Sequence, residues 1–233
     1  MRKNGLLKVA TALSVVMLTA ATPGRALVCT PCGPTPPAGP QGVRTSDYQP
    51  INVIGGVKNV FGNLADLPKW DRVRRAIASD AMAADPRMQP WIAWAQALRG
   101  QPASERLNAI NARVNQRLRY VIDQIADGVP DYWQTPLETV TRGTGDCEDY
   151  AILKYYLALH AGITHQELAL VIGRIVSTGE LHAVMVAQSE RGWRLLDNRV
   201  NNVIDLGGRA DLGAIFFVDV SSVWVPAARP SQR

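Results

Sequence analysis

Residues 150–159 constrain the fold of this chain more than any other part of its sequence. Every position in this stretch is apolar or aromatic except Lys154. A helix that is apolar on all sides is buried inside a core rather than packed on its surface. The residues just before it favour a tight turn and a helix cap: Gly143, Thr144, Gly145 and Asp146. The sequence therefore predicts a buried helix whose first turn contains Cys147.

The segments that precede this helix carry apolar residues at helical spacing. The pattern predicts helices over residues 67–84, 88–98 and 104–125, with Ser104 as the N-cap of the third. One stripe of the third segment is apolar: Leu107, Ile110, Val114, Leu118, Val121, Ile122 and Ile125. A stripe of this kind packs on a core, and the arginines elsewhere on the segment are expected to form a solvated face.

The pattern changes after residue 166, where segments rich in β-branched and aromatic residues are separated by turn residues. Strands are predicted over residues 168–176, 181–187, 193–196 and 215–220. Helices followed by strands that short turns connect are typical of an α+β fold. We therefore expect N-terminal helices packed on an antiparallel sheet.

Both ends of the chain lie outside this predicted domain. Residues 1–26 combine a basic start, a short apolar stretch and small residues, which is typical of a secretory signal peptide cleaved after Ala26. An uncleaved membrane anchor is the alternative. Residues 27–58 form a proline-rich linker, residues 59–226 the folded domain and residues 227–233 a tail. The sequence therefore predicts an exported protein.

The basic character of the chain comes mostly from this leader. The chain has 25 Lys and Arg residues against 20 Asp and Glu, and a sequence pI near 9.3. Four of the basic residues lie in the leader, which holds no acid, so the mature chain carries 21 basic and 20 acidic residues. This balance gives no reason to expect nucleic acid as a partner.

The chain contains three cysteines, Cys29, Cys32 and Cys147. In an oxidising compartment Cys29 and Cys32 can form a disulfide or remain an inert pair, which leaves Cys147 as a free thiol. A metal site at the first two would need a second pair of ligands, and a thioredoxin-like site would need a strand and a helix around it. Cys147 is therefore the cysteine for which a chemical role is considered.

The predicted position of Cys147 suits a nucleophile. The start of a helix presents free backbone N–H groups and the positive end of the helix dipole, which lower the pKa of a thiol and can hold an oxyanion. The alternative is a buried structural cysteine. A base beside the thiol would decide between the two.

The predicted hairpin between the strands at 181–187 and 193–196 supplies a candidate base. If Gln188 pairs with Arg191 across the turn, His182 pairs with Asp197, and directly opposed side chains lie on the same face of the sheet. A slip of one residue would separate them, so this register is a hypothesis.

The other two histidines have no such partner. His160 lies late in the buried helix and His165 lies in a turn. The sequence therefore predicts a nucleophile, a base and an orienting acid at Cys147, His182 and Asp197.

Four segments carry a specific resemblance to a known family. They are residues 128–138, 143–156, 181–184 and 195–198, and the most specific part is Asp-Cys-Glu-Asp-Tyr-Ala at residues 146–151. They resemble the bacterial transglutaminase-like cysteine peptidases, most closely the LapG-like periplasmic proteases, over about residues 60–225. The resemblance implies a papain-like fold and hydrolysis of a peptide bond, and the family triad falls on Cys147, His182 and Asp197.

The same resemblance implies a place in the cell and a set of partners. LapG-like members are periplasmic, and they cleave the N-terminal region of a large surface adhesin, which releases cells from biofilms. The periplasmic domain of an inner-membrane receptor that senses cyclic di-GMP in the cytoplasm holds them in check. The resemblance thus implies a periplasmic location, an adhesin substrate and a receptor of this kind.

The resemblance also implies calcium, bound by acidic residues that flank the cysteine. These fall on Asp146, Glu148 and Asp149. Three carboxylates so close together repel one another unless they are solvated or neutralised, and Ca²⁺ takes six to eight oxygen ligands. The alternative is that Asp146 only caps the helix, while Glu148 and Asp149 favour its positive end.

Two other functions are compatible with these residues. A transglutaminase-type acyltransferase would use the same triad and pass the Cys147 thioester to an amine instead of water. A catalytically inert, calcium-dependent binding module would keep the fold, but it has no need of a complete triad. Trp133 is either a wall or N–H donor of the site or an amphipathic aromatic at the domain edge.

Overall fold

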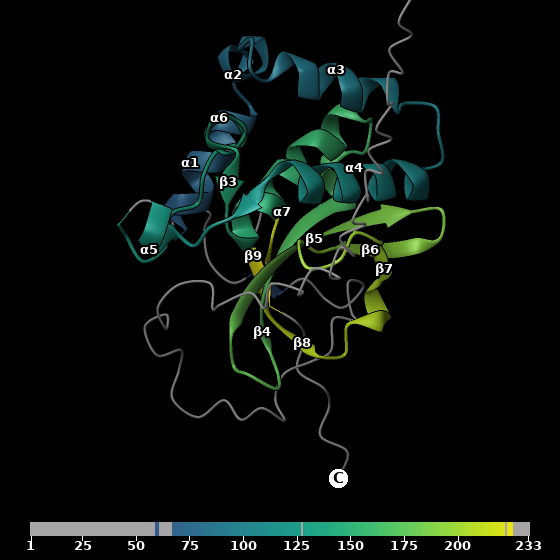
Figure 1. The fold of residues 1–233 in the computed structure, drawn as a ribbon. Helices are drawn as coiled ribbons and strands as arrows, with labels where there is room; N and C mark the ends of the chain where they lie inside the picture. The colour runs from purple at the N-terminus through teal and green to yellow at the C-terminus, as the bar shows by residue number, and fades with distance from the viewer. Residues whose placement is uncertain (1–58, 61–66, 127, 222, 226–233) are drawn as a thin grey trace, which may run out of the picture.

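The computed structural model describes residues 59–60, 67–126, 128–221 and 223–225. The predicted signal peptide, linker and tail lie outside these residues, as do Cys29 and Cys32, so those predictions stay untested. In the described part, helices gather on one side of an antiparallel sheet (Figure 1). This arrangement confirms the predicted α+β class.

Within the described residues the main sheet has seven strands in the order β1-β9-β8-β4-β5-β6-β7, and all neighbours are antiparallel. The strands are β1 (Asn59–Val60), β4 (Leu168–Ile175), β5 (Leu181–Ser189), β6 (Gly192–Leu196), β7 (Ile204–Asp205), β8 (Leu212–Val218) and β9 (Val223–Val225). Two short strands, β2 (Arg119–Tyr120) and β3 (Thr144–Gly145), form a separate parallel pair.

The helices of the described part are α1 (Pro68–Ile77), α2 (Asp80–Ala84), α3 (Gln89–Ala97), α4 (Ala103–Arg117), α5 (Asp123–Ala126), α6 (Pro136–Arg142) and α7 (Cys147–His160). Two single 3₁₀ turns, η3 (His165–Glu167) and η4 (Leu206–Gly208), follow. None of the helices placed in these residues is long and apolar enough to cross a membrane.

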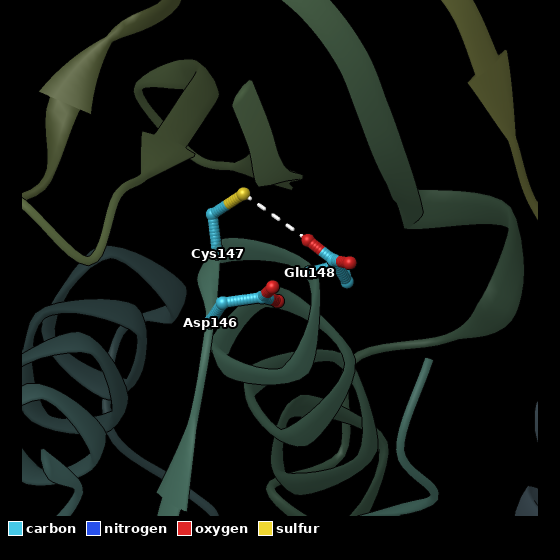
Figure 2. Close-up of side chains that lie close together, drawn as sticks. All are labelled: Asp146, Cys147 and Glu148. Atoms are coloured by element: carbon cyan, nitrogen blue, oxygen red, sulfur yellow. Dashed lines mark hydrogen bonds between the residues drawn. The ribbon is translucent and has the colours of Figure 1, made fainter. Parts of the chain in front are cut away.

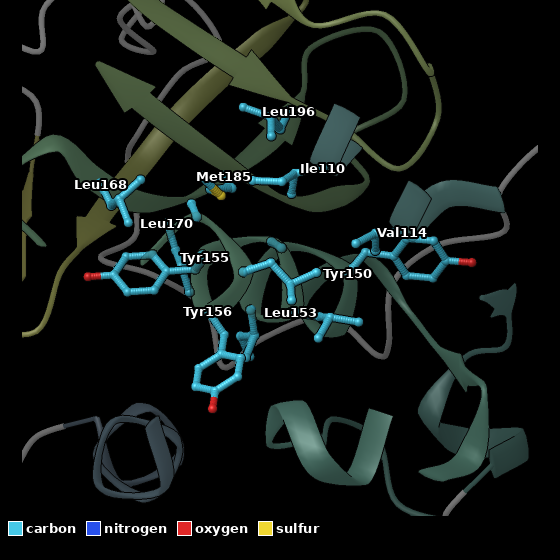
Figure 3. Packing of buried hydrophobic residues seen from close by; sticks show 14 of the residues in the cluster. Ile110, Val114, Tyr150, Leu153, Tyr155, Tyr156, Leu168, Leu170, Met185 and Leu196 are labelled. Atoms are coloured by element: carbon cyan, nitrogen blue, oxygen red, sulfur yellow. The ribbon is translucent and has the colours of Figure 1, made fainter. Parts of the chain in front are cut away.

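The packing of α7 between the sheet and the other helices forms the main core. Leu153 and Tyr155 of α7 have no exposed surface, and they share one cluster with Leu170 of β4 and Met185 of β5 (Figure 3). The predicted buried helix is therefore present, and it starts at Cys147.

The third predicted helix is shorter than expected. The α4 helix ends at Arg117, and Leu118 is already extended. The backbone N–H groups of Arg119 and Val121 donate to the carbonyls of Gly143 and Gly145, each at 3.0 Å. Pairing of β2 with β3 thus overrides the helical pattern after Arg117, and Ile125 of the predicted apolar stripe is 76% exposed.

Two other helix predictions differ in detail. The segment predicted as one helix over residues 67–84 forms two, α1 and α2, which residues 78–79 separate. Ser104 is not an N-cap, because Pro102 holds that position and the Ser104 hydroxyl donates to Glu190 in the β5–β6 turn.

The observed end of α4 predicts a large loss of stability for one residue of the predicted apolar stripe and almost none for another. Leu107 has no exposed surface, so Leu107→Ala is expected to lower the free energy of unfolding by about 2–5 kcal/mol. Ile125→Ala is expected to change it by less than about 0.5 kcal/mol. Urea denaturation of the two variants measures both values, and a loss at Ile125 as large as the loss at Leu107 would mean that Ile125 is buried, which contradicts the structure.

Candidate active site

The start of α7 is held by backbone and side-chain contacts around Asp149. Its carboxylate accepts hydrogen bonds from the backbone N–H of Gln134 at 2.8 Å and of Asp146 at 3.1 Å. A Cβ at position 145 would lie 2.6 Å from the Asp149 side chain, which leaves room for glycine alone without a shift. Asp146 is the N-cap, so the predicted glycine turn and cap are both present.

The sulfur of Cys147 lies between the first turn of α7 and strand β5. The backbone N–H of Ala183 donates to Sγ at 3.4 Å, which places the residue after His182 against the sulfur. Sγ also lies 3.2 Å from Oε2 of Glu148, the next residue of the helix (Figure 2). Cys147 is only 1% exposed. The cysteine is therefore tied to the histidine strand on one side and to a carboxyl group on the other.

His182 and Asp197 form the pair that the sequence predicts. His182 Nε2 lies 2.9 Å from Asp197 Oδ1, and the two side chains are almost completely buried. Because a carboxylate only accepts, Nε2 carries the hydrogen. Nδ1 of His182 is buried and has no hydrogen-bond partner among the described residues. This second nitrogen is therefore available to take a proton.

The register that led to this pair is nevertheless wrong by two residues. Val186 pairs with Leu195 rather than with Trp193, and Ser189 pairs with Gly192 across a two-residue turn. An even shift leaves every side chain on its predicted face. Asp197 follows the end of β6, and it reaches His182 as a diagonal neighbour rather than as the directly opposed residue.

Asp197 is held ionised by the donors around it. Besides His182, its Oδ1 accepts the backbone N–H of Arg199 at 2.9 Å, and its Oδ2 accepts from the Arg209 guanidinium. Burial raises the pKa of Asp197, but the hydrogen bond and charge of His182, together with Arg209 and the Arg199 N–H, outweigh it and hold the pKa below its usual range.

A cluster of acidic side chains surrounds the start of α7. Its carboxylate oxygens approach within 4.8 Å of one another in overlapping groups, drawn from Asp123, Asp131, Asp146, Glu148 and Asp149. The structure thus brings the three predicted metal ligands together, and it adds two that sequence reasoning missed. Asp131 lies in the segment 128–138 that carries the family resemblance, which is the signal that points to it. Asp123 was assigned to a continuous helix and gave none.

The buried acids of this cluster do not behave as ordinary carboxylates. Burial, outweighing other effects, raises the pKa of Asp146 to about 8, and it raises the pKa values of Glu148 and Asp149 well above their usual range. Repulsion between the neighbouring carboxylates adds to this. Oδ1 of Asp146 is buried without a hydrogen-bond partner in the described part. Such oxygens suit a hard cation, so the residues present fit Ca²⁺.

Trp133 has a structural role in this arrangement. Its ring packs edge-on against Trp70 with centroids 6.4 Å apart, and its backbone carbonyl accepts from Arg72. Only 9% of Trp133 is exposed. These contacts favour the structural alternative over a role as N–H donor.

Comparison with known proteins finds one family model that matches the chain and several solved structures with a similar fold. The family model described as "Bacterial transglutaminase-like cysteine proteinase BTLCP" matches residues 93–207, which include Cys147, His182 and Asp197. No curated protein matches the chain.

Solved structures of LapG from Legionella pneumophila have a similar fold. The EGTA-treated form has a TM-score of 0.55 and 23% identity, and the match covers 69% of this chain and 87% of that one. The calcium-bound form has a TM-score of 0.54 and 24% identity, with 71% and 91% covered.

Proposed function

We propose that this protein, whose residues 93–207 belong to the bacterial transglutaminase-like cysteine proteinase family, is an exported, calcium-dependent endopeptidase with Cys147, His182 and Asp197 as its triad. The family makes the chain a cysteine peptidase. The observation that carries the triad is the 2.9 Å hydrogen bond between His182 and Asp197 beside the Cys147 sulfur.

In this proposal each residue has one task. Nδ1 of His182 takes the proton of the reduced Cys147 thiol, and the thiolate attacks the carbonyl carbon of the peptide bond. Backbone N–H groups at the start of α7 face the oxyanion that forms. The imidazolium returns its proton to the leaving amine, and water then hydrolyses the thioester. Asp197 keeps the imidazole in the tautomer that this sequence of steps requires.

Calcium is proposed to bind the acidic cluster at the start of α7. Asp123, Asp131, Asp146, Glu148 and Asp149 supply oxygen ligands. The bound cation would supply positive charge that neutralises these buried carboxylates. An ionised Glu148 at 3.2 Å disfavours a thiolate on Cys147, so neutralising it favours the reactive form. LapG was solved in both calcium-bound and EGTA-treated forms, which supports the proposal.

The proposed location and partners rest on the leader and on the family resemblance. Residues 1–26 have the composition of a signal peptide, which supports export to the periplasm. The proposed substrate is the N-terminal region of a large surface adhesin, whose cleavage would control biofilm attachment. The proposed regulator is the periplasmic domain of a cyclic di-GMP-sensing inner-membrane receptor.

The triad predicts a graded loss of peptide hydrolysis. With reduced protein in calcium, Cys147→Ala and His182→Ala are expected to lose activity by about 10⁴-fold or more, because both groups take part in bond making. Asp197→Asn is expected to keep a larger residual rate, since it only orients the base. Incubation with a library of proteome-derived peptides and mass spectrometry of new N-termini measures the rates.

Two further arms make this experiment decisive. The double variant of His182 and Asp197 is expected to be hardly worse than His182→Ala alone, because the two act as one unit. Monodansylcadaverine added to the library serves as an amine acceptor. Incorporation of the amine in place of hydrolysis would identify an acyltransferase, and full activity of Cys147→Ala would contradict the triad.

The acidic cluster predicts a stability that depends on pH and calcium. A carboxyl group with a raised pKa stabilises the folded protein fully below its unfolded pKa near 4, and this contribution is lost as the pH rises through the folded value. With Asp146 at about 8, the melting temperature in EGTA is expected to fall between pH 4 and pH 8. Excess calcium is expected to raise it most at pH 8, because the cation binds the ionised carboxylates.

A pair of matched variants isolates the cluster from other effects of charge. Glu148 and Glu105 both lie in the first turn of a helix, but only Glu148 is buried. In EGTA at pH 8, Glu148→Gln is expected to have a higher melting temperature than the wild type. Added calcium is expected to raise the melting temperature of Glu148→Gln less than that of the wild type. Glu105→Gln is expected to follow the wild type in both conditions. Identical melting with and without calcium would contradict the site.

A further inference from the structure

Asp197 receives one partner from beyond the segment that the family model matches. Arg209 follows the η4 turn, two residues past the matched range 93–207. Its Nη1 donates to Oδ2 of Asp197, and the pair also forms an ion pair. The side chains of Arg209 and Asp197 are 11% and 0% exposed. A partly buried guanidinium thus contacts the acid of the proposed triad on the side that faces away from the histidine nitrogen.

The two oxygens of Asp197 have separate partners. Oδ1 accepts from His182 and from the backbone of Arg199, at 2.9 Å in each case. Oδ2 accepts from Arg209. The rest of the guanidinium donates to Asp211 through Nε at 2.8 Å and Nη2 at 3.2 Å. Because a guanidinium is planar and rigid, these contacts fix the orientation of the Asp197 carboxylate as well as its charge.

Other charged groups near Asp197 do not replace Arg209. Lys154 of α7 acts on it electrostatically, but burial lowers the pKa of Lys154 to about 7, and its Nζ has no hydrogen-bond partner in the described part. The side chain of Arg199 turns to Glu180, so only its backbone contacts Asp197. An arginine stays charged at every working pH. Arg209 is therefore the permanent cation on this carboxylate.

We propose that Arg209 is a positioning residue of the triad, which holds the Asp197 carboxylate ionised and aligned so that Asp197 keeps His182 directed at Cys147. This inference rests on the proposed triad. A buried carboxylate oxygen that lost the Arg209 guanidinium would lack compensation for its charge, and such a group takes up a proton or moves. Either change would weaken the orientation of the imidazole.

The competing explanation is that Arg209 only fastens the turn between β7 and β8. A fastening role would change the stability of the fold without changing which protons the triad holds. A positioning role works through charge. Removal of a positive charge makes nearby groups hold their protons more tightly, so the reactivity of Cys147 would move to higher pH.

The test is the pH profile of alkylation of Cys147 by iodoacetamide, on reduced full-length protein in calcium, with melting temperatures recorded alongside. Arg209→Met is expected to raise the midpoint of the profile by about one pH unit, which lowers the rate about tenfold on the acid side. Arg209→Lys is expected to shift the midpoint less than Arg209→Met, because it keeps the charge but loses the planar guanidinium. If Arg209→Met does not fold, Arg209→Gln replaces it, and a wild-type midpoint in that variant overturns the inference.

A matched arginine controls for the loss of a half-buried ion pair. Arg194 is 13% exposed and pairs with the exposed Asp205, away from the triad. Arg194→Met is expected to keep the wild-type midpoint, and a shift as large as that of Arg209→Met would overturn the inference. Asp197→Asn distinguishes failure of the triad from failure of the role of Arg209. If Asp197→Asn has the alkylation profile of the wild type, the proposed triad is wrong. If Asp197→Asn has a shifted profile but Arg209→Met has the wild-type profile, only the role proposed for Arg209 is wrong.

Discussion

The burial of α7 on every side determines where the chemistry of this protein lies. Between residues 150 and 159 the helix carries no charged side chain except Lys154, so the sheet and the other helices must enclose it, and Leu153 and Tyr155 are completely covered. Its first turn is thereby pressed against β5, where the N–H of Ala183 contacts the sulfur of Cys147. A hydrophobic requirement thus brings the cysteine to the strand that carries His182.

The same enclosure buries the acidic residues at the start of α7, and removal of their charged forms from water is energetically unfavourable. Asp146, Glu148 and Asp149 sit at the positive end of the helix, which favours negative charge, but that effect is worth at most about 2 kcal/mol for each group. It does not offset the removal of several carboxylates from water, as their raised pKa values indicate. Because Glu148 also touches the sulfur, whatever neutralises this cluster also acts on Cys147.

The sequence was sufficient for features that depend on local pattern, and insufficient for those that depend on long-range pairing. The apolar run predicted α7, because an all-apolar helix has one stable environment, and the turn and cap residues before it placed Cys147 in the first turn. The same periodicity failed after Arg117, where hydrogen bonds to Gly143 and Gly145 replace helical ones. Because residues 104–125 were predicted as one helix, Asp123 was not recognised as a member of the acidic cluster. The predicted register of the hairpin was wrong by two residues. It still identified Asp197, because an even shift leaves each side chain on the same face of the sheet.

Two sets of equally buried carboxyl groups behave in opposite ways, and the difference lies in the donors that each one meets. Asp197 has no exposed surface, but an imidazole, a backbone N–H and a guanidinium all point at it, so its pKa is lowered. Asp146 is 1% exposed and meets other carboxylates, so its pKa is raised. Burial alone therefore does not decide the charge of an acid in this protein. Asp197 obtains its positive partners from the chain itself, in His182 and Arg209, whereas the cluster beside Cys147 has none among its own members. A cation from solution would do for that cluster what Arg209 does for Asp197, and the reactivity of the cysteine would then depend on both.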